Sequence, residues 1–262
     1  MEVKNILANF YQDYDEEGRL LSRVGKVEYL TTMRYVDKYL RPGMRVMEIG
    51  AATGRYSHAL AQQGFRVDAV ELVEHNIEIF RQNIQPGEKV TIAQGNACDL
   101  SGFEDGTYDV TLLLGPMYHL FTEEDKLQAL SEAIRVTKKG GVIFAAYCMA
   151  DPCIMSYGFR KGNILSLIEK GMVETEHFKA FSNPQELFEL HRTEDIDALR
   201  SHFDVESLHF LAADGYAPHM RDTVEAMDDQ TYEVYLKYHF ATCERMDLIG
   251  YSNHTLDIFR KR

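Results

Sequence analysis

The sequence predicts an α/β protein with a doubly wound, mostly parallel sheet of seven strands and helical cap insertions. Short apolar segments alternate with segments of helical periodicity between about residues 41 and 150, an order that builds parallel sheets with right-handed crossovers. The segment 108–114 is too apolar for a half-exposed strand, which indicates a central strand buried on both faces. Proline and glycine residues lie between these segments and mark their ends. These three observations set the fold class.

The individual elements follow in order. Residues 1–40 have a helical pattern that ends at Pro42-Gly43, because neither residue continues a helix. Thr122 with Asp125 resembles a capping box, and Thr193 is expected to cap a later helix. Strands are expected at 44–49, 65–71, 90–94, 108–114, 142–147, 205–211 and 254–259. Further helices are expected at 54–64, 76–83, 122–140, 193–203 and 222–246.

The run EIGAATG at residues 48–54 follows an apolar strand and opens a helix. The carboxylate of Glu71 comes about 20 residues later, which is the spacing of a βαβ unit whose acid binds ribose hydroxyls. A dinucleotide turn would need glycines where this chain has Ala52 and Arg55. Arginine at the third glycine position prevents close packing over a pyrophosphate. The turn therefore favours a nucleoside without a pyrophosphate.

Four ordered segments, EIGAATG, VDAVEL, GNACDL and YDVTLLLG, resemble those of class I S-adenosylmethionine-dependent methyltransferases. The resemblance implies that Glu71 binds both ribose hydroxyls and that Asn96-Ala97 lie beside the adenine, with Asp99 as a competing residue. It implies that the methionine part of the cofactor lies among Glu48, Gly50, Ala51, Ala52, Thr53 and Gly54. Leu72, Leu114 and Gly115, at or after neighbouring strand ends, complete the expected site. Ala52 departs from the middle glycine of the usual GxGxG turn.

In this family the methyl acceptor approaches after strand four, where this chain has GPMYH at residues 115–119. His119 is a candidate general base for a hydroxyl, or else a helix-start histidine bonded to backbone. Tyr118 is a candidate catalytic residue or a wall of the pocket. The segment partly resembles the Asn/Asp-Pro-Pro-Tyr motif of some amino-methyltransferases, but Gly115 has no side chain to hold an amine, so amine specificity does not follow.

The chain is expected to divide into an N-terminal helical lid (1–40), a cofactor-binding core (41–150), a cap insertion (151–183), and a C-terminal part of the core (184–262) with a helical insertion at about 212–250. Tyr11 and Tyr14 are the candidate lid residues over the substrate. The expected cap also offers apolar side chains at Tyr157, Phe159, Tyr216 and Met220.

The net charge of −13 argues against a nucleic-acid partner, since phosphate contact needs clustered Lys and Arg. A small-molecule, largely apolar or aromatic acceptor is expected instead. No leader or membrane-length apolar run is recognised, so a cytoplasmic protein is expected. Four cysteines without CxxC and histidines without HxxxH give no support for a metal. An oxidoreductase is disfavoured by the missing glycines, whereas a non-catalytic S-adenosylmethionine-binding sensor or scaffold stays open. The oligomeric state is not set by the sequence.

Overall fold

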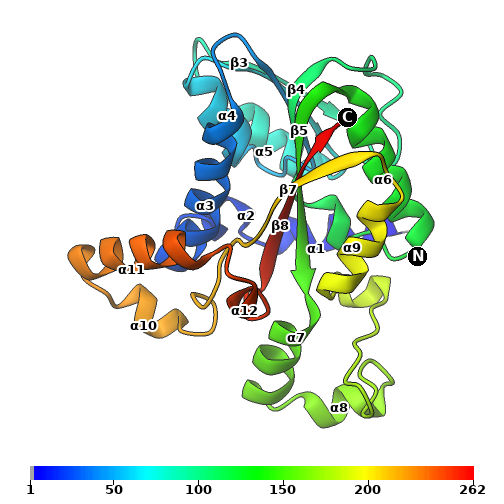
Figure 1. Ribbon diagram of the computed structural model, residues 1–262, viewed down its shortest axis with the longest axis vertical. Coiled ribbons are helices and arrows are strands. Elements are labelled where there is room, and N and C mark those ends of the chain that lie inside the picture. The colour runs from blue at the N-terminus through cyan, green and yellow to red at the C-terminus, as the bar shows by residue number, and fades with distance from the viewer. Residues whose placement is uncertain (1–2) are drawn as a thin grey trace.

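The computed structural model describes residues 3–262 and has one mixed sheet at its centre (Figure 1). Its strands are β1 (Arg45–Ile49), β2 (Arg66–Glu71), β3 (Lys89–Gln94), β4 (Tyr108–Leu113), β5 (Thr137–Met149), β6 (Leu190–His191), β7 (Val205–Ala212) and β8 (His254–Lys261). The strand order is β3-β2-β1-β4-β5-β8-β7, and β6 pairs with the end of β5. Within the described residues, β8 runs antiparallel to both of its neighbours, β5 and β7, and every other strand pair is parallel. The predicted doubly wound, mostly parallel sheet is confirmed.

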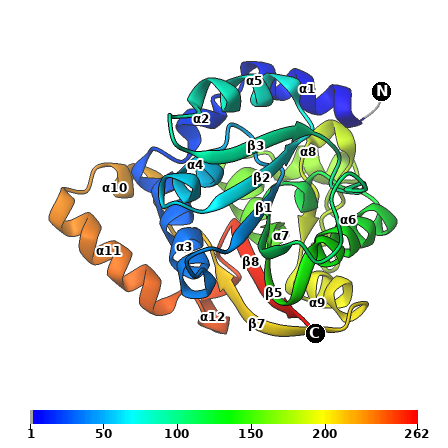
Figure 2. The ribbon, with the colours of Figure 1, turned by 90° about the horizontal axis from the view of Figure 1, so that it is seen from above.

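Helices cover both faces of this sheet (Figure 2). The α-helices are α1 (Val3–Asp13), α2 (Glu16–Arg19), α3 (Arg23–Tyr39), α4 (Arg55–Gln62), α5 (Glu74–Asn83), α6 (Glu123–Val136), α7 (Ala150–Cys153), α8 (Ile164–Glu169), α9 (Thr193–Ser201), α10 (Arg221–Glu225), α11 (Asp229–Thr242) and α12 (Met246–Ile249). Two 3₁₀ helices, η1 (Pro116–Tyr118) and η3 (Pro184–Glu186), and one π-helix, η2 (Ile154–Arg160), complete the helical elements. Helices α3, α4 and α5 pack on one face, and α6 and α9 pack on the other.

The central strands β1 and β4 are buried on both faces, as the apolar run 108–114 predicts. Their parallel register places Ile49 beside both Val70 of β2 and Leu113 of β4. The carboxyl ends of β1, β2 and β4 therefore meet at one edge of the sheet, where ligands of open α/β sheets bind.

Two expected boundaries and the expected number of strands are wrong. Strand β5 begins at Thr137 and not at Val142, because Thr137 pairs with Tyr108 and the register then shifts. Gly140 thus lies inside an irregular part of the strand and does not end a helix. Helix α9 begins at Thr193, so its N-cap is Arg192, whose backbone N–H donates to Asp195 at 2.8 Å. The sheet has eight strands and not seven, because the two-residue strand β6 carries too little pattern to be recognised.

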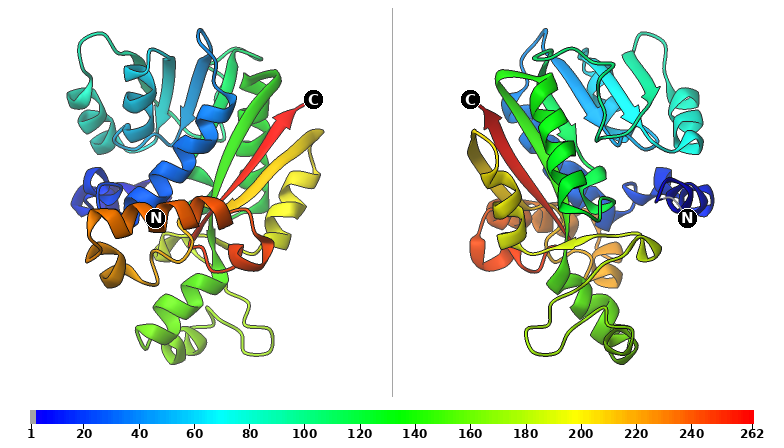
Figure 3. Two further views of the ribbon diagram at one scale, coloured as in Figure 1. Left: turned by 60° about the vertical axis from the view of Figure 1, so that its left-hand side comes forward. Right: turned by 90° about the vertical axis from the view of Figure 1, so that its right-hand side faces the viewer.

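The N-terminal segment lies across the carboxyl edge of the sheet. Helix α1 packs beside α5 and η3, at opposite sides of that edge, and Figure 3 shows α1 and α2 below the strand ends. Residues 1–2 of the expected lid lie outside the described residues. Residues 150–169 form a helical projection farther along, around α7 and α8 (Figure 1). None of the helices among residues 3–262 has the length and apolar character that crossing a bilayer requires.

Candidate active site

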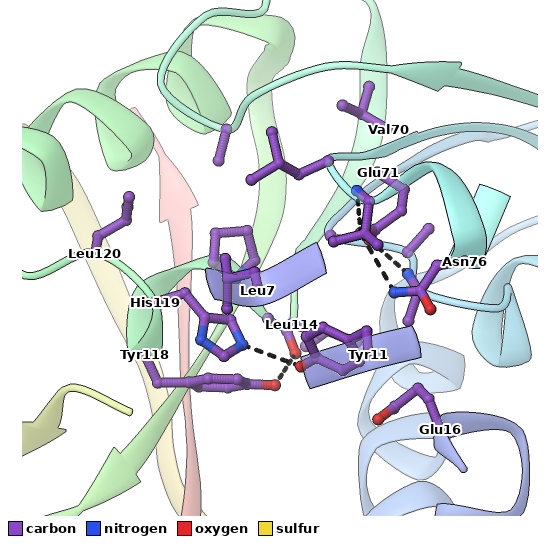
Figure 4. Close-up of a pocket in the computed structure, with 18 of the residues that line it drawn as sticks. Leu7, Tyr11, Glu16, Val70, Glu71, Asn76, Leu114, Tyr118, His119 and Leu120 are labelled. Atoms are coloured by element: carbon purple, nitrogen blue, oxygen red, sulfur yellow. Dashed lines mark hydrogen bonds between the residues drawn. The ribbon is translucent and has the colours of Figure 1, made fainter. Parts of the chain in front are cut away.

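A cavity of about 620 Å³ lies at the carboxyl ends of β1, β2 and β4, next to α1 (Figure 4). The volume lies in the range of roughly 300–1,000 Å³ that is usual for small-molecule sites. The predicted cofactor residues that line it are Glu48, Gly50, Ala51, Ala52, Thr53, Glu71, Leu72, Asn96, Ala97, Leu114 and Gly115. The predicted acceptor and lid residues that line it are Tyr11, Tyr14, Tyr118 and His119. Among these predicted residues, the cavity brings together side chains up to 108 residues apart, the separation of Tyr11 and His119.

Gly54 is the predicted cofactor residue that does not line the cavity. Its φ of 90° lies in the left-handed region, and a Cβ there would be 2.4 Å from a ring carbon of Phe80. The residue allows α4 to begin close against α5. The structure thus gives Gly54 a packing role, and its direct contact with the cofactor stays a prediction.

The turn after β1 is held by backbone and carboxylate contacts. The N–H groups of Gly50 and Ala51 both donate to the carbonyl of Val70, at 2.8 and 3.1 Å. Ala52 adopts a φ of 47°, which costs an L-residue energy and explains why glycine is usual in this part of the turn. The Ala52 N–H donates to Oε2 of Glu71 at 2.9 Å, so the strained residue is held by the acid of the next strand.

Glu71 presents its carboxylate on the cavity wall at the end of β2. Its Oε1 accepts from the backbone N–H of Val73 at 2.9 Å, and the residue is 7% exposed. Burial raises the pKa of Glu71, while the N–H groups of Val73 and Ala52 act in the opposite direction. Oε1 also accepts from Nδ2 of Asn76 at 3.5 Å, whereas Oε2 accepts the one bond from Ala52 and keeps a second acceptor position, because an ionised carboxylate offers about four.

Glu48 at the end of β1 is the more deeply buried acid, with 2% exposure. The Ser57 hydroxyl of α4 donates to its Oε2. Burial raises the pKa of Glu48 to about 8, and the neighbouring Glu71 adds to this increase. A cation next to these two acids would favour their ionised forms.

The structure distinguishes the two residues after β3, Asn96 and Asp99, that were candidates for the position beside the adenine. Asn96, Ala97 and Cys98 line the cavity, and the Asn96 Oδ1 accepts from the Cys98 N–H at 3.0 Å. Asp99 lies outside the lining, and its carboxylate accepts from the Ser101 N–H at 3.0 Å. The turn interpretation therefore fits Asp99, and Asn96 is the residue beside the cavity.

Tyr11 and His119 connect the N-terminal helix to the segment after β4, as Figure 4 shows. The Tyr11 hydroxyl lies 3.1 Å from Nε2 of His119, and Nδ1 lies 2.8 Å from the carbonyl of Leu187. Since a carbonyl only accepts, Nδ1 carries the proton and Nε2 accepts from Tyr11. Burial lowers the pKa of His119 to about 4, so its ring is neutral at physiological pH.

Tyr118 is a wall residue in this geometry. Its hydroxyl donates to the carbonyl of Leu114 at 2.8 Å, and the side chain is buried. Burial raises the pKa of Tyr118 well above its usual value. A hydroxyl that is already bound to backbone and resists ionisation supports the pocket-wall interpretation over the catalytic one.

Four apolar residues of the expected cap, Tyr157, Phe159, Tyr216 and Met220, do not line the cavity. The segment around α7 and α8 projects beyond the carboxyl end of β5 (Figure 1). Other residues that sequence reasoning missed take their place: Phe10, Glu16, Arg19, Phe188 and His254. They come from four separate segments, and no local motif marks any of them.

The chain is similar in sequence to known methyltransferases. Residues 46–141 match the family model described as a methyltransferase domain. A ubiquinone biosynthesis O-methyltransferase of Xanthomonas campestris pv. campestris is 25% identical over 193 residues, covering 72% of this chain and 77% of that protein. A protein of the same name from Methylocella silvestris is 26% identical over 180 residues and covers 68% of each chain.

Solved structures match the fold. A SAM-dependent methyltransferase from Thermotoga maritima superposes with a TM-score of 0.57 at 19% identity and covers all of both chains. A SAM-dependent methyltransferase from Methanosarcina mazei has a TM-score of 0.57 at 16% identity, covering 87% of this chain and 96% of that one.

The strand order with its antiparallel β8, together with the acid-lined cavity at the carboxyl edge, defines the class I methyltransferase architecture. With the family match and the relatives, the chain is a class I S-adenosylmethionine-dependent methyltransferase, and S-adenosylmethionine is its cofactor.

Proposed function

We propose that this enzyme methylates a small, largely aromatic molecule that binds between α1 and the carboxyl edge of the sheet. The observation that carries the proposal is the aromatic end of the cavity. The rings of Phe10 and Tyr14 stack at 4.8 Å, and Phe188 lies 6.3 Å from Phe10 and 5.4 Å from His119, measured between centroids. Such a chamber suits a planar apolar molecule with a few polar groups.

The other end of the cavity would hold the cofactor. The carboxylate of Glu71 would accept the two ribose hydroxyls, Glu48 and the turn at residues 50–53 would surround the methionine part, and Asn96-Ala97 would lie beside the adenine. The lining fits a cationic ligand, because two buried carboxyl groups share one wall. When bound, the cofactor supplies a methyl group that its sulfonium already activates. The chain then has to orient the acceptor and exclude water.

The N-terminal residues 3–40 would act as the lid that excludes this water, over the core at 41–150 and 184–262. The link between Tyr11 and His119 joins the lid to the core at the cavity itself. Phe10 and Tyr14 add apolar surface on the same side. The lid thereby positions the acceptor next to the segment after β4.

A small acceptor fits the charge distribution better than a nucleic acid does. The chain carries a net charge of −13, and the acids of the cavity lining, Glu16, Glu48, Glu71 and Asp125, outnumber its cations Lys4, Arg19 and Arg55. The curated relatives named as O-methyltransferases support oxygen as the acceptor atom. A cofactor-binding scaffold without turnover is not favoured, because the aromatic chamber beside the cofactor end would then have no occupant.

The test is methyl transfer from radiolabelled S-adenosylmethionine to a panel of phenols, catechols, aromatic amines and transfer RNA. Transfer to a phenol or catechol, unchanged by moderate salt, is expected. Salt-sensitive methylation of the RNA would contradict the proposal, since phosphate contacts give a steep inverse dependence on salt. Cofactor binding without transfer to any arm of the panel would favour the scaffold.

A further inference from the structure

A second histidine, His254, faces the same cavity from the first residue of β8. Its Nδ1 lies 2.7 Å from Oδ2 of Asp214. Its Nε2 has no hydrogen-bond partner among residues 3–262, and the side chain is 25% exposed. His254 lines the cavity, and among the described residues Nε2 is the ring nitrogen left without a partner, so it is the atom of the ring available to a ligand.

Asp214 holds this ring in one orientation. Its side chain is 3% exposed, and its Oδ1 accepts from the Ser252 hydroxyl at 2.7 Å and from the His254 backbone N–H at 3.1 Å. A buried carboxylate opposite Nδ1 fixes the proton there and stabilises the doubly protonated ring. The pair has the arrangement of an acid–base dyad, in which the carboxylate orients the base.

The surroundings of His254 favour its charged form. The titratable groups that face it come from different segments: Tyr14, Glu16, Glu28, Tyr118, Cys148, Cys153 and Asp214. Glu28 lies 3.6 Å from Nδ1 and binds Arg19 at 2.8 Å, and Arg19 also binds Glu16 at 3.0 Å. Burial acts to lower the pKa of His254, but Glu28, Cys148 and Asp214 raise it well above its usual value. Two carboxyl groups, Glu16 and Glu28, share the guanidinium of Arg19, and Asp214 lies against His254, so a second cation fits.

The other cavity histidine is a weaker base. Nε2 of His119 already accepts from Tyr11, and burial lowers the pKa of His119 to about 4. A proton that leaves a substrate hydroxyl would not stay on that ring at physiological pH. Of the two rings, His254 is the one that can stay charged beside a phenolate.

We propose that the His254–Asp214 pair ionises the acceptor, and that the acceptor is a phenol or catechol. The charged His254 ring donates its Nε2–H to the acceptor oxygen; the O–H bond of the substrate breaks, its proton leaves to water, and the electron pair stays on the phenolate oxygen. A substrate that binds already ionised to the charged ring gives the same imidazolium–phenolate pair. The proposal rests on the proposed function, which supplies the methyl group that this oxygen receives.

Glu28, Asp214 and His254 also lie close enough together to ligate a metal ion. Arg19 competes for Glu28 at 2.8 Å, and a charged His254 cannot ligate. The dyad therefore accounts for the cluster better than a metal does. The experiment below tests the metal alternative by adding Mg²⁺ and a chelator.

The test uses 4-nitrophenol, whose ionised form absorbs visible light, bound to the protein saturated with S-adenosylhomocysteine. We expect the bound probe to ionise more readily than the free probe, with roughly tenfold more phenolate at the same pH, because a cation within hydrogen-bond distance lowers the pKa of an acid by about one unit or more. His254→Gln should abolish the shift. His202→Gln, at an exposed histidine outside the cavity, should retain it.

Unshifted ionisation of the probe in the unmodified protein, or absence of probe binding, would overturn the proposal, as would a shift that survives in a folded His254→Gln. A shift that requires Mg²⁺ and disappears with chelator would overturn it in favour of a metal. If the variant fails to fold, ¹⁵N spectra of the histidine rings in the unmodified complex decide: His254 should carry both ring protons at neutral pH, and a singly protonated ring would contradict the proposal. Methyl transfer in the radiolabel assay and binding of S-adenosylhomocysteine are measured separately. Failure of the proposed function can therefore be told apart from failure of the proposed role of His254.

Discussion

Replacing Glu48 by glutamine should stabilise the cofactor-free protein, and the gain should grow as the pH rises. The Glu48 side chain is 2% exposed, and burial raises its pKa from 4.5 to about 8. In the unfolded chain the same carboxyl ionises near its ordinary pKa. The stability that Glu48 contributes is therefore fully present below pH 4.5 and is lost progressively as the pH rises through about 8.

The magnitude follows from this shift. Each pKa unit corresponds to about 1.36 kcal/mol, so the loss between about pH 5 and pH 9 is roughly 4 kcal/mol. Solvent screening takes little from this figure, because the carboxyl group is buried. Glutamine keeps an oxygen that can accept from the Ser57 hydroxyl and does not titrate. Its advantage over glutamate should therefore widen by about that amount.

The assay is urea unfolding of both proteins without cofactor at the two pH values, with the difference in free energy of unfolding as the readout. This difference cancels the contributions of all groups that titrate equally in the two proteins. Glu233→Gln, at an exposed position of α11, serves as the control and should show no widening. Parallel stability curves for Glu48→Gln and the unmodified protein would refute the reasoning, because they would show that the buried acid ionises at its ordinary pKa.

Three further predictions concern the turn and the lid. Glu71→Ala should weaken cofactor binding by about ten- to a hundredfold, as expected when charged hydrogen bonds worth roughly 1.5–3 kcal/mol are lost; calorimetry measures this, and undiminished affinity would show that Glu71 does not bind the cofactor. Gly54→Ala should destabilise the fold by more than Gly64→Ala in thermal unfolding, because both have a left-handed φ but only the Gly54 Cβ would collide with its surroundings, within 2.4 Å; equal losses would mean that the close approach is unimportant. Tyr11→Phe should lower kcat/KM several-fold with the fold intact, since one hydrogen bond to His119, worth about 0.5–1.5 kcal/mol, is removed; unchanged kinetics would contradict a lid function of this contact.

The cofactor end of the site could be predicted from sequence because its residues lie at strand ends. A strand, a small-residue turn and a helix are local features, and the parallel order of strands brings their carboxyl ends together. Glu48, Glu71 and Asn96 could thus be placed on one cavity before the structure was known. Gly54 could not be separated from its neighbours, because the collision with Phe80 depends on how α4 and α5 pack.

The acceptor end could not be predicted in the same way. His254 acquires its significance from Asp214, which is 40 residues away in another segment, and no spacing rule relates the two. The exposed aromatic residues Tyr157 and Phe159 suggested a cap by composition alone, yet their segment projects away from the cavity. Pairings between distant loops depend on tertiary packing, which local pattern does not encode.

The most direct test of the account is isothermal titration of the protein with S-adenosylmethionine, S-adenosylhomocysteine and NAD. The account predicts saturable binding of the first two at one site per chain, weakened by Glu71→Ala, and no binding of NAD, because Ala52 and Arg55 replace the glycines of a pyrophosphate turn. Saturable binding of NAD without binding of S-adenosylmethionine would contradict it.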